Sequence, residues 1–87
     1  MHVILGPSFR KQYRKLPAPI RQKFDERLEL FAVEPFHPLL NNHALHGERT
    51  GHRSINITSS YRATFKMAKP DAAQFTAIGT HHELYGA

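Results

Sequence analysis

Histidines and cations gather in the second half of this 87-residue chain, between His43 and Tyr85. The histidines stand at the ends of segments that have strand character, and the middle segment carries Arg62 and Lys66 on its polar face. Histidine exchanges a proton near neutral pH because its unperturbed pKa is about 6.5, and cations neutralise phosphate charge. This combination favours phosphate chemistry, and we expect the first half of the chain to be a scaffold.

Alternation of apolar and polar residues predicts an antiparallel sheet in the second half. In residues 61–67 every second residue is apolar, and in residues 51–57 Ile55 and Ile57 alternate with polar neighbours. A period of two is typical of half-buried strands. Residues 58–60 join these segments and residues 68–72 lead to a third, residues 75–85; both connections suit hairpins. One face of the sheet should therefore be apolar and the other polar.

The first half predicts a strand followed by two helices. Residues 2–5 form a short apolar run, and residues 9–16 place Phe9, Tyr13 and Leu16 on one helical face. Residues 20–33 carry an apolar stripe that we expect in the core: Ile20, Phe24, Leu28, Leu30, Phe31 and Val33. Residues 35–42 contain two prolines and two asparagines, which predicts a loop. Leu45 is the next expected apolar anchor.

The element order predicts an α+β fold of the small βααβββ kind, in one domain that spans residues 1–87. Two N-terminal antiparallel helices should pack on one face of a mainly antiparallel, twisted sheet. A chain of this length has room for one small core and no separate cofactor domain. The absence of cysteine excludes disulfides and thiolate metal sites. No apolar run approaches the roughly 18 residues that span a bilayer, so we expect a soluble protein.

The formal net charge of +5 and the pI near 10.0 favour a polyanionic partner. Part of this charge forms a basic ridge on the first helix, opposite the apolar face. The basic ridge consists of Arg10, Lys11, Arg14 and Lys15. The alternative is that these cations are only a solvated surface, as on many helices.

The motifs of the second half, in their order and spacing, resemble the RelE/ParE toxin superfamily, nearest its YafQ-like branch. The residues that carry the resemblance are His43, Leu45, Gly47, Gly51, Arg53, Ile78, Gly79, Thr80, His81, Leu84 and Tyr85. The resemblance implies a RelE-like fold and a bacterial cytoplasmic toxin of a type II toxin-antitoxin system. Such a toxin cleaves mRNA on the ribosome, and a cognate acidic antitoxin holds it inactive in a hetero-oligomer.

This cleavage uses attack of a ribose 2′-OH on the adjacent phosphate, without a metal or another cofactor. It requires two proton carriers and one or two cations that stabilise the phosphorane. By the resemblance, His81 takes the first proton role and His43 the second, with His46 close enough to replace His43. The structural alternatives are that His81 only ends a strand and that His43 is a loop residue.

The remaining roles concern charge and RNA contact. The resemblance gives Arg53, with help from Arg62, the task of neutralising the transition state through bidentate phosphate contacts. By the same resemblance, Tyr85 would stack on a base or orient the phosphate. The structural alternatives are that Tyr85 belongs to the core and that the stem of Arg62 only covers apolar sheet surface. The expected RNA-binding residues are Arg10, Lys11, Arg14, Lys15, Lys66 and Asn56.

The chain departs from the YafQ-like branch along the first hairpin strand, where Ser54, Asn56 and Ser60 replace acidic residues and a histidine. None of these side chains can act as a proton carrier at neutral pH. Two other functions therefore stay open. One is a ParE-like toxin that acts by binding DNA gyrase. A toxin of this kind would have no need of a C-terminal segment with His81 and Tyr85, which is the feature against it. The other is a catalytically weakened toxin-fold protein that acts by binding an antitoxin.

Overall fold

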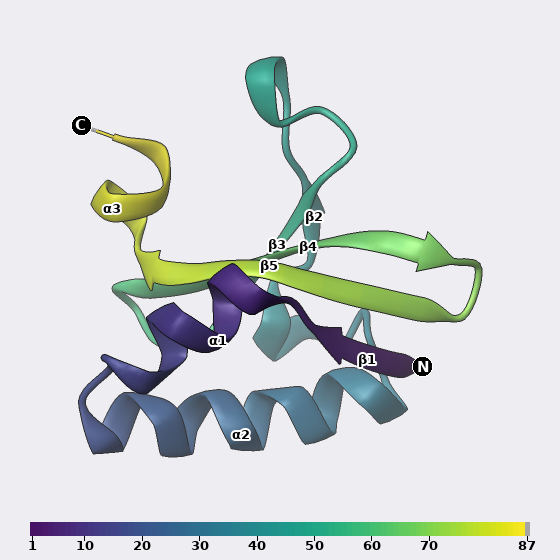
Figure 1. Cartoon of the computed structure of the whole chain (residues 1–87). Coiled ribbons are helices and arrows are strands. Elements are labelled where there is room, and N and C mark those ends of the chain that lie inside the picture. The colour runs from purple at the N-terminus through teal and green to yellow at the C-terminus, as the bar shows by residue number, and fades with distance from the viewer. Residues whose placement is uncertain (87) are drawn as a thin grey trace.

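The computed structural model describes residues 1–86, which form a five-stranded sheet with the strand order β1-β5-β4-β3-β2 (Figure 1). Strand β1 pairs parallel to β5, and every other neighbouring pair is antiparallel. The strands are β1 His2–Leu5, β2 His43–Ala44, β3 Arg53–Asn56, β4 Tyr61–Lys69 and β5 Ala72–Thr80. The predicted α+β fold with a mainly antiparallel sheet is confirmed.

Two of the helices cover one face of this sheet, as predicted (Figure 1). Helix α1 is Pro7–Arg14, α2 is Ala18–Val33 and α3 is His81–Tyr85, with 3-10 turns η1 Pro38–Leu40 and η2 Gly47–Arg49. Pro7 begins α1 and Pro19 lies in the first turn of α2, where the missing N–H of proline is not needed. The Tyr13 hydroxyl donates to Asp25 (2.8 Å) and ties α1 to α2. Within residues 1–86 no helix is long and apolar enough to cross a membrane.

Phenylalanine rings fill the space between the helices and the sheet. The ring of Phe75 on β5 has its centroid 5.1 Å from that of Phe65 on β4 and 5.3 Å from that of Phe31 on α2. The rings of Phe9 and Phe24 complete the cluster, with their centroids 5.9 and 6.0 Å from that of Phe75. Tilted and edge-to-face ring pairs each contribute about 0.5–1.5 kcal/mol beyond the area they bury. This cluster holds β5 against both helices.

The core differs from the prediction at three positions. Val33 was expected in the apolar stripe but is 86% exposed, since it is the last residue of α2. Met67 is 42% exposed, because the β4–β5 hairpin extends beyond the end of α2 (Figure 1). Leu40 is fully buried instead, since η1 turns it inward within the stretch that was expected to be a plain loop.

The end of the last strand was also predicted wrongly. His81 does not end β5 but begins α3, since the Thr80 hydroxyl accepts the Glu83 N–H (3.1 Å). Glu83 in return accepts the N–H of Thr80 (2.7 Å). This reciprocal pair is a capping box, which satisfies backbone groups that a helix start leaves unpaired. The strand therefore ends one residue before His81, and a helix of five residues follows.

Replacing Phe75 with alanine should lower the free energy of unfolding by about 3–5 kcal/mol, because a cavity would open between four other rings. Val33→Ala on the exposed end of α2 is the control and should change it by less than about 0.5 kcal/mol. Urea denaturation measures both. Equal losses in the two variants would contradict the placement of Phe75 at the centre of the core.

Candidate active site

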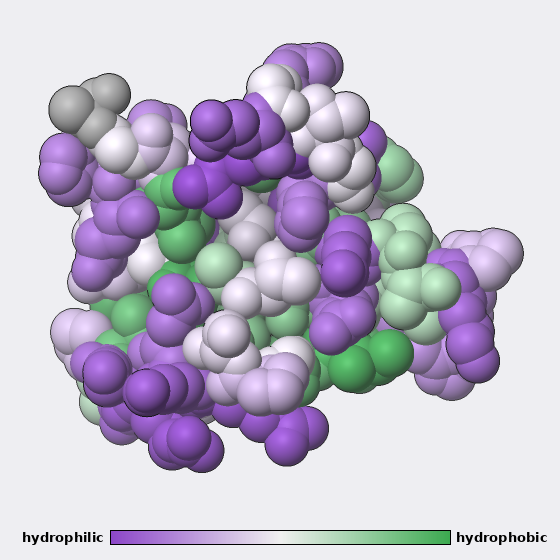
Figure 2. Space-filling view, turned by 45° about the horizontal axis from the view of Figure 1, so that its top comes forward, coloured by the Kyte–Doolittle hydropathy of each residue, from purple (hydrophilic) through white to green (hydrophobic). Residues whose placement is uncertain are grey.

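The face of the sheet that α1 and α2 leave open carries two projections, the β2–β3 connection and α3 (Figure 1). Figure 2 shows residues of intermediate hydropathy in the middle of this side of the molecule, with hydrophilic residues around them. Because Ile55 points into the core, Ser54 and Asn56 on either side of it lie on the open face of β3. Their partners on β4, Thr64 and Arg62, lie on the same face.

Helix α3 brings His81 and Tyr85 together above this face. They lie four residues apart, so both rings are on one side of the helix, with their centroids 4.7 Å apart. The Tyr85 hydroxyl donates to the Ser54 hydroxyl oxygen (2.7 Å), and Ser54 is fully buried beneath it. Tyr85 thus fixes α3 to β3, and its ring is held beside His81.

Arg49 at the end of η2 joins the two projections. Its guanidinium donates to the carbonyl oxygen of Leu84 and lies 5.2 Å from the centroid of the Tyr85 ring. A cation in this position is attracted to the ring face. The sequence analysis missed Arg49, which lies between two of the motif glycines, Gly47 and Gly51. Both glycines have positive φ (70° and 95°), which other residues rarely adopt.

His43 joins this group from the neighbouring strand. It is the Cα partner of Ser54 across the β2–β3 pair, so its side chain is on the open face. Its Nδ1 atom is 2.7 Å from the carbonyl oxygen of Asn41. The structure therefore places His43 and Tyr85, two of the predicted catalytic residues, next to Ser54, and places a third, His81, beside Tyr85.

Two buried polar atoms on the same face have no hydrogen-bond partner among the described residues. They are Nδ1 of His52 and Oδ1 of Asn56, which lie two residues before and after Ser54. An unpaired buried polar atom costs about 1–3 kcal/mol, so such atoms favour a place where a polar ligand is bound. Of these two residues, the sequence analysis named Asn56, as an RNA contact.

The structure does not bring Arg53 to this group. Arg53 alternates with Ser54, so it lies on the helix side of the sheet. There its Nε donates to Oδ1 of Asn42 (2.8 Å), and its guanidinium stacks 5.4 Å from the centroid of Phe36. This environment is that of a structural cation under the loop that follows α2.

Arg62 lies nearer to the site, folded over the β3–β4 turn. Its guanidinium donates to the carbonyl oxygens of Thr58 (2.7 Å) and Ser59 (3.2 Å). The next carbonyl, that of Ser60, accepts the N–H of His81 (3.0 Å). The turn that Arg62 covers is therefore hydrogen-bonded to the first residue of α3.

The other predicted residues are exposed. His46 precedes η2 at the tip of the β2–β3 connection, and Lys66 is two residues beyond Thr64 on the open side of β4. The four cations of the basic ridge are all exposed on α1 and the residue after it, and none is ion-paired within residues 1–86. Across the same residues, no three His, Asp or Glu side chains are grouped as metal ligands.

No protein-family model and no curated protein matches the chain. Solved structures do match it over nearly its whole length. YafQ from E. coli is 19% identical, with a TM-score of 0.79 over 97% of both chains. The chain has the fold of a RelE/ParE toxin. The toxin-antitoxin complex RelBE2 from Mycobacterium tuberculosis is 18% identical, with a TM-score of 0.76 over 92% of this chain and 96% of that one.

A third neighbour of the same toxin fold is the YoeB-YefM complex from Staphylococcus aureus. It is 14% identical, with a TM-score of 0.74 over 93% of this chain and 97% of that one. The resemblance inferred from the motifs is thus confirmed at the level of the fold.

The capping box makes the position of α3 sensitive to acid. Backbone and side-chain hydrogen bonds from Thr80 hold the pKa of Glu83 below its ordinary value of 4.5. A pKa that is lower in the folded state means that the charged carboxylate stabilises α3. This contribution is complete above pH 4.5 and is lost as the pH falls through the lower, folded pKa.

We therefore expect α3 to fray on acidification, which would release the Tyr85 hydroxyl from Ser54. The NMR signals of the Tyr85 ring, followed from neutral pH to below the Glu83 pKa, measure this. Glu83→Gln is the control, because glutamine still closes a capping box but does not titrate in this range. The same acid-induced change in both proteins would contradict the role of Glu83.

Proposed function

We propose that this protein is the toxin of a type II toxin-antitoxin system and a ribosome-dependent mRNA endonuclease that needs no metal. The observation that supports it is the assembly of His81, His43 and Arg49 on the open face of the sheet. Two proton carriers and a cation are what RNA cleavage by the 2′-OH requires. The toxin fold alone does not supply this argument, since one fold hosts several functions.

In this proposal two histidines share the proton transfers. One histidine accepts the proton of the ribose 2′-OH, the 2′-oxygen attacks the adjacent phosphorus, and the 5′-oxygen leaves with a proton from the other histidine. His81 is one of the pair, and His43 or His52 on the open face is the other. The products are a 2′,3′-cyclic phosphate and a free 5′-hydroxyl.

The charge that develops on the phosphorane falls to Arg49, with Arg62 as the second cation. Arginine offers planar, bidentate donors that match phosphate oxygens. Tyr85 is fixed at its hydroxyl by Ser54 and presents its ring to a base. Asn56, whose Oδ1 is unpaired, would receive a donor from the RNA.

Binding to the ribosome would use the basic ridge on α1. Its four exposed cations can displace counterions from ribosomal RNA, which gives affinity that falls steeply with salt and ignores sequence. The partner that silences the toxin would be an acidic, partly disordered antitoxin in the bacterial cytoplasm, complementary to the net charge of +5. The RelBE2 and YoeB-YefM neighbours are themselves toxin-antitoxin complexes.

A second candidate function is that of a weakened toxin-fold protein that acts by binding an antitoxin. The observation that favours it is the engagement of the Ser54 hydroxyl by Tyr85 in the middle of the site. A serine at this point can orient other groups by hydrogen bonding but cannot act as a general acid or base at neutral pH. Gyrase binding is the third alternative, and no feature described on the open face favours it.

Cleavage of mRNA in a reconstituted translation system tests the proposal. At equal concentrations of folded protein, His81→Ala and Arg49→Ala should each lower the cleavage rate by about 10²-fold or more. Arg53→Ala is the matched control, since its guanidinium lies on the helix side with Asn42, and it should keep most of the activity.

Absence of cleavage by the wild-type protein would refute the nuclease, and antitoxin-binding and gyrase-inhibition assays would then decide between the alternatives. If Arg53→Ala lost as much activity as Arg49→Ala, the catalytic cation would be Arg53, as the motif resemblance implied. Cleavage unaffected by His81→Ala would move both proton roles to His43 and His52.

A further inference from the structure

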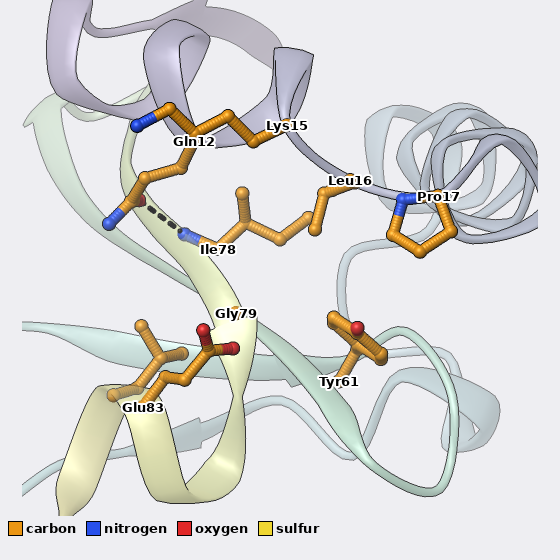
Figure 3. A pocket seen from close by; sticks show the side chains of 9 residues that line it. Gln12, Lys15, Leu16, Pro17, Tyr61, Ile78, Gly79 and Glu83 are labelled. Carbon is orange, nitrogen blue, oxygen red and sulfur yellow. Dashed lines mark hydrogen bonds between the residues drawn. The ribbon is translucent and has the colours of Figure 1, made fainter.

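A hollow of about 200 Å³ lies on the side of α3 that faces away from the candidate active site (Figure 3). Glu83 faces it and is two residues from His81, which in a helix is about 200° around the axis. The hollow is therefore separated from the candidate active site by α3 itself. Its walls come from α1, β4, β5 and α3, together with the residues that follow α1.

The walls combine apolar surface with a few fixed polar groups. The side chains of Leu16, Ile78 and Leu84 and the ring of Tyr61 supply the apolar part. Gln12 is held in place because its Oε1 accepts the N–H of Ile78 (3.0 Å), so its amide NH₂ remains as a donor (Figure 3).

The carboxylate of Glu83 is the acceptor in this hollow. Oε1 takes the N–H of Thr80 (2.7 Å), which fixes the group, and a carboxylate has further lone pairs to offer. Gly79 leaves it room, since a Cβ at that position would lie 3.2 Å from Oε1. Lys15, the last cation of the basic ridge, also lines the hollow.

The size and the arrangement of groups suit one flat ring system. A cavity of about 150 Å³ holds a benzene ring, whereas drug-sized ligands occupy about 300–1,000 Å³. A hollow of 200 Å³ therefore fits a single nucleobase. We propose that this hollow binds one guanine base of an RNA whose phosphates lie along the basic ridge.

Guanine matches the polar groups because its N1–H and N2–H are adjacent donors, which pair with one carboxylate, here that of Glu83. Its O6 atom accepts hydrogen bonds from cationic or amide donors, the groups that Lys15 and Gln12 present. Uracil lacks two adjacent donors. The guanidinium of a partner protein would also suit the carboxylate, but the exposed cations of the ridge repel it.

The source of the guanine, messenger or ribosomal RNA, rests on the proposed function, but the binding of the base does not. NMR titration of the ¹⁵N-labelled protein with GMP, IMP and UMP tests the base alone. GMP should shift the amide signals of Gly79 and Glu83 and saturate. IMP, which lacks the N2 amine, should bind about tenfold more weakly, as expected for one lost hydrogen bond to a charged group. UMP should not shift these signals.

Variants separate recognition of the base from attraction of its phosphate. Glu83→Gln keeps the capping box and should lower GMP affinity about tenfold, because one acceptor becomes a donor. Lys15→Met should lower GMP affinity at the Gly79 and Glu83 signals, because a donor to O6 is lost. Lys11→Met is the matched control, since Lys11 is on the ridge but does not line the hollow, and it should lower this affinity less than Lys15→Met does.

Equal shifts from GMP and UMP, or none from either, would overturn the proposal. Saturation by N-acetylarginine amide in place of GMP would also overturn it and would assign the hollow to a basic side chain. Ribosome complexes that carry 6-thioguanosine only in the mRNA then distinguish the two sources. A photocrosslink to the peptide with Tyr61 assigns messenger RNA, and its absence, with GMP binding retained, assigns ribosomal RNA. If the wild-type protein binds GMP but does not cleave mRNA, the proposed function is refuted and the guanine site is not.

Discussion

The packing of Phe75 against four other phenylalanine rings is the contact on which the rest of this structure depends. Phe75 is on β5, the strand that pairs with both β1 and β4. Its carbonyl oxygen also accepts the N–H of Gly6, where the chain leaves β1 and enters α1. Burial of this one ring therefore fixes the strand that positions α1, α3 and the β4 side of the open face.

The candidate active site depends on a different kind of contact, between two projections that are marginal on their own. A helix of five residues is too short to be stable in isolation, because helix nucleation is costly. α3 is held by the Thr80–Glu83 capping box, by Tyr85 on Ser54 and by Arg49 on Leu84. Loss of any one of these contacts would loosen His81, so the site is expected to be among the first parts of the fold to open.

Cations of the same type have different environments here because of the face on which each lies. Arg49 and Arg53 are four residues apart, yet the first reaches the Tyr85 ring and the second stacks on Phe36 on the helix side. Arg53 is on β3, where the pleat turns its side chain to the helix side, whereas Arg49 is on η2, before the strand begins. A basic residue near a motif can therefore be assigned a catalytic role only when the face of the sheet on which it lies is known.

The amino-acid sequence predicted the fold class, the presence of the two N-terminal helices and most of the core. Proline positions and a helical period in residues 9–33 are local signals, and the alternation in residues 61–67 set which face of β4 is buried. The motif resemblance also indicated His43, His81 and Tyr85; the structure places His43 and Tyr85 next to Ser54, and His81 beside Tyr85.

Only the tertiary structure decided which cation accompanies these residues and what α3 encloses. Arg49 meets Leu84 across 35 positions of sequence, and Gln12 meets Ile78 across 66. The short helix itself was missed, because its capping box begins on the last residue of a strand. Hydrogen bonds between distant segments leave no periodic trace in a sequence, since they depend on strand register and on where two projections end in space.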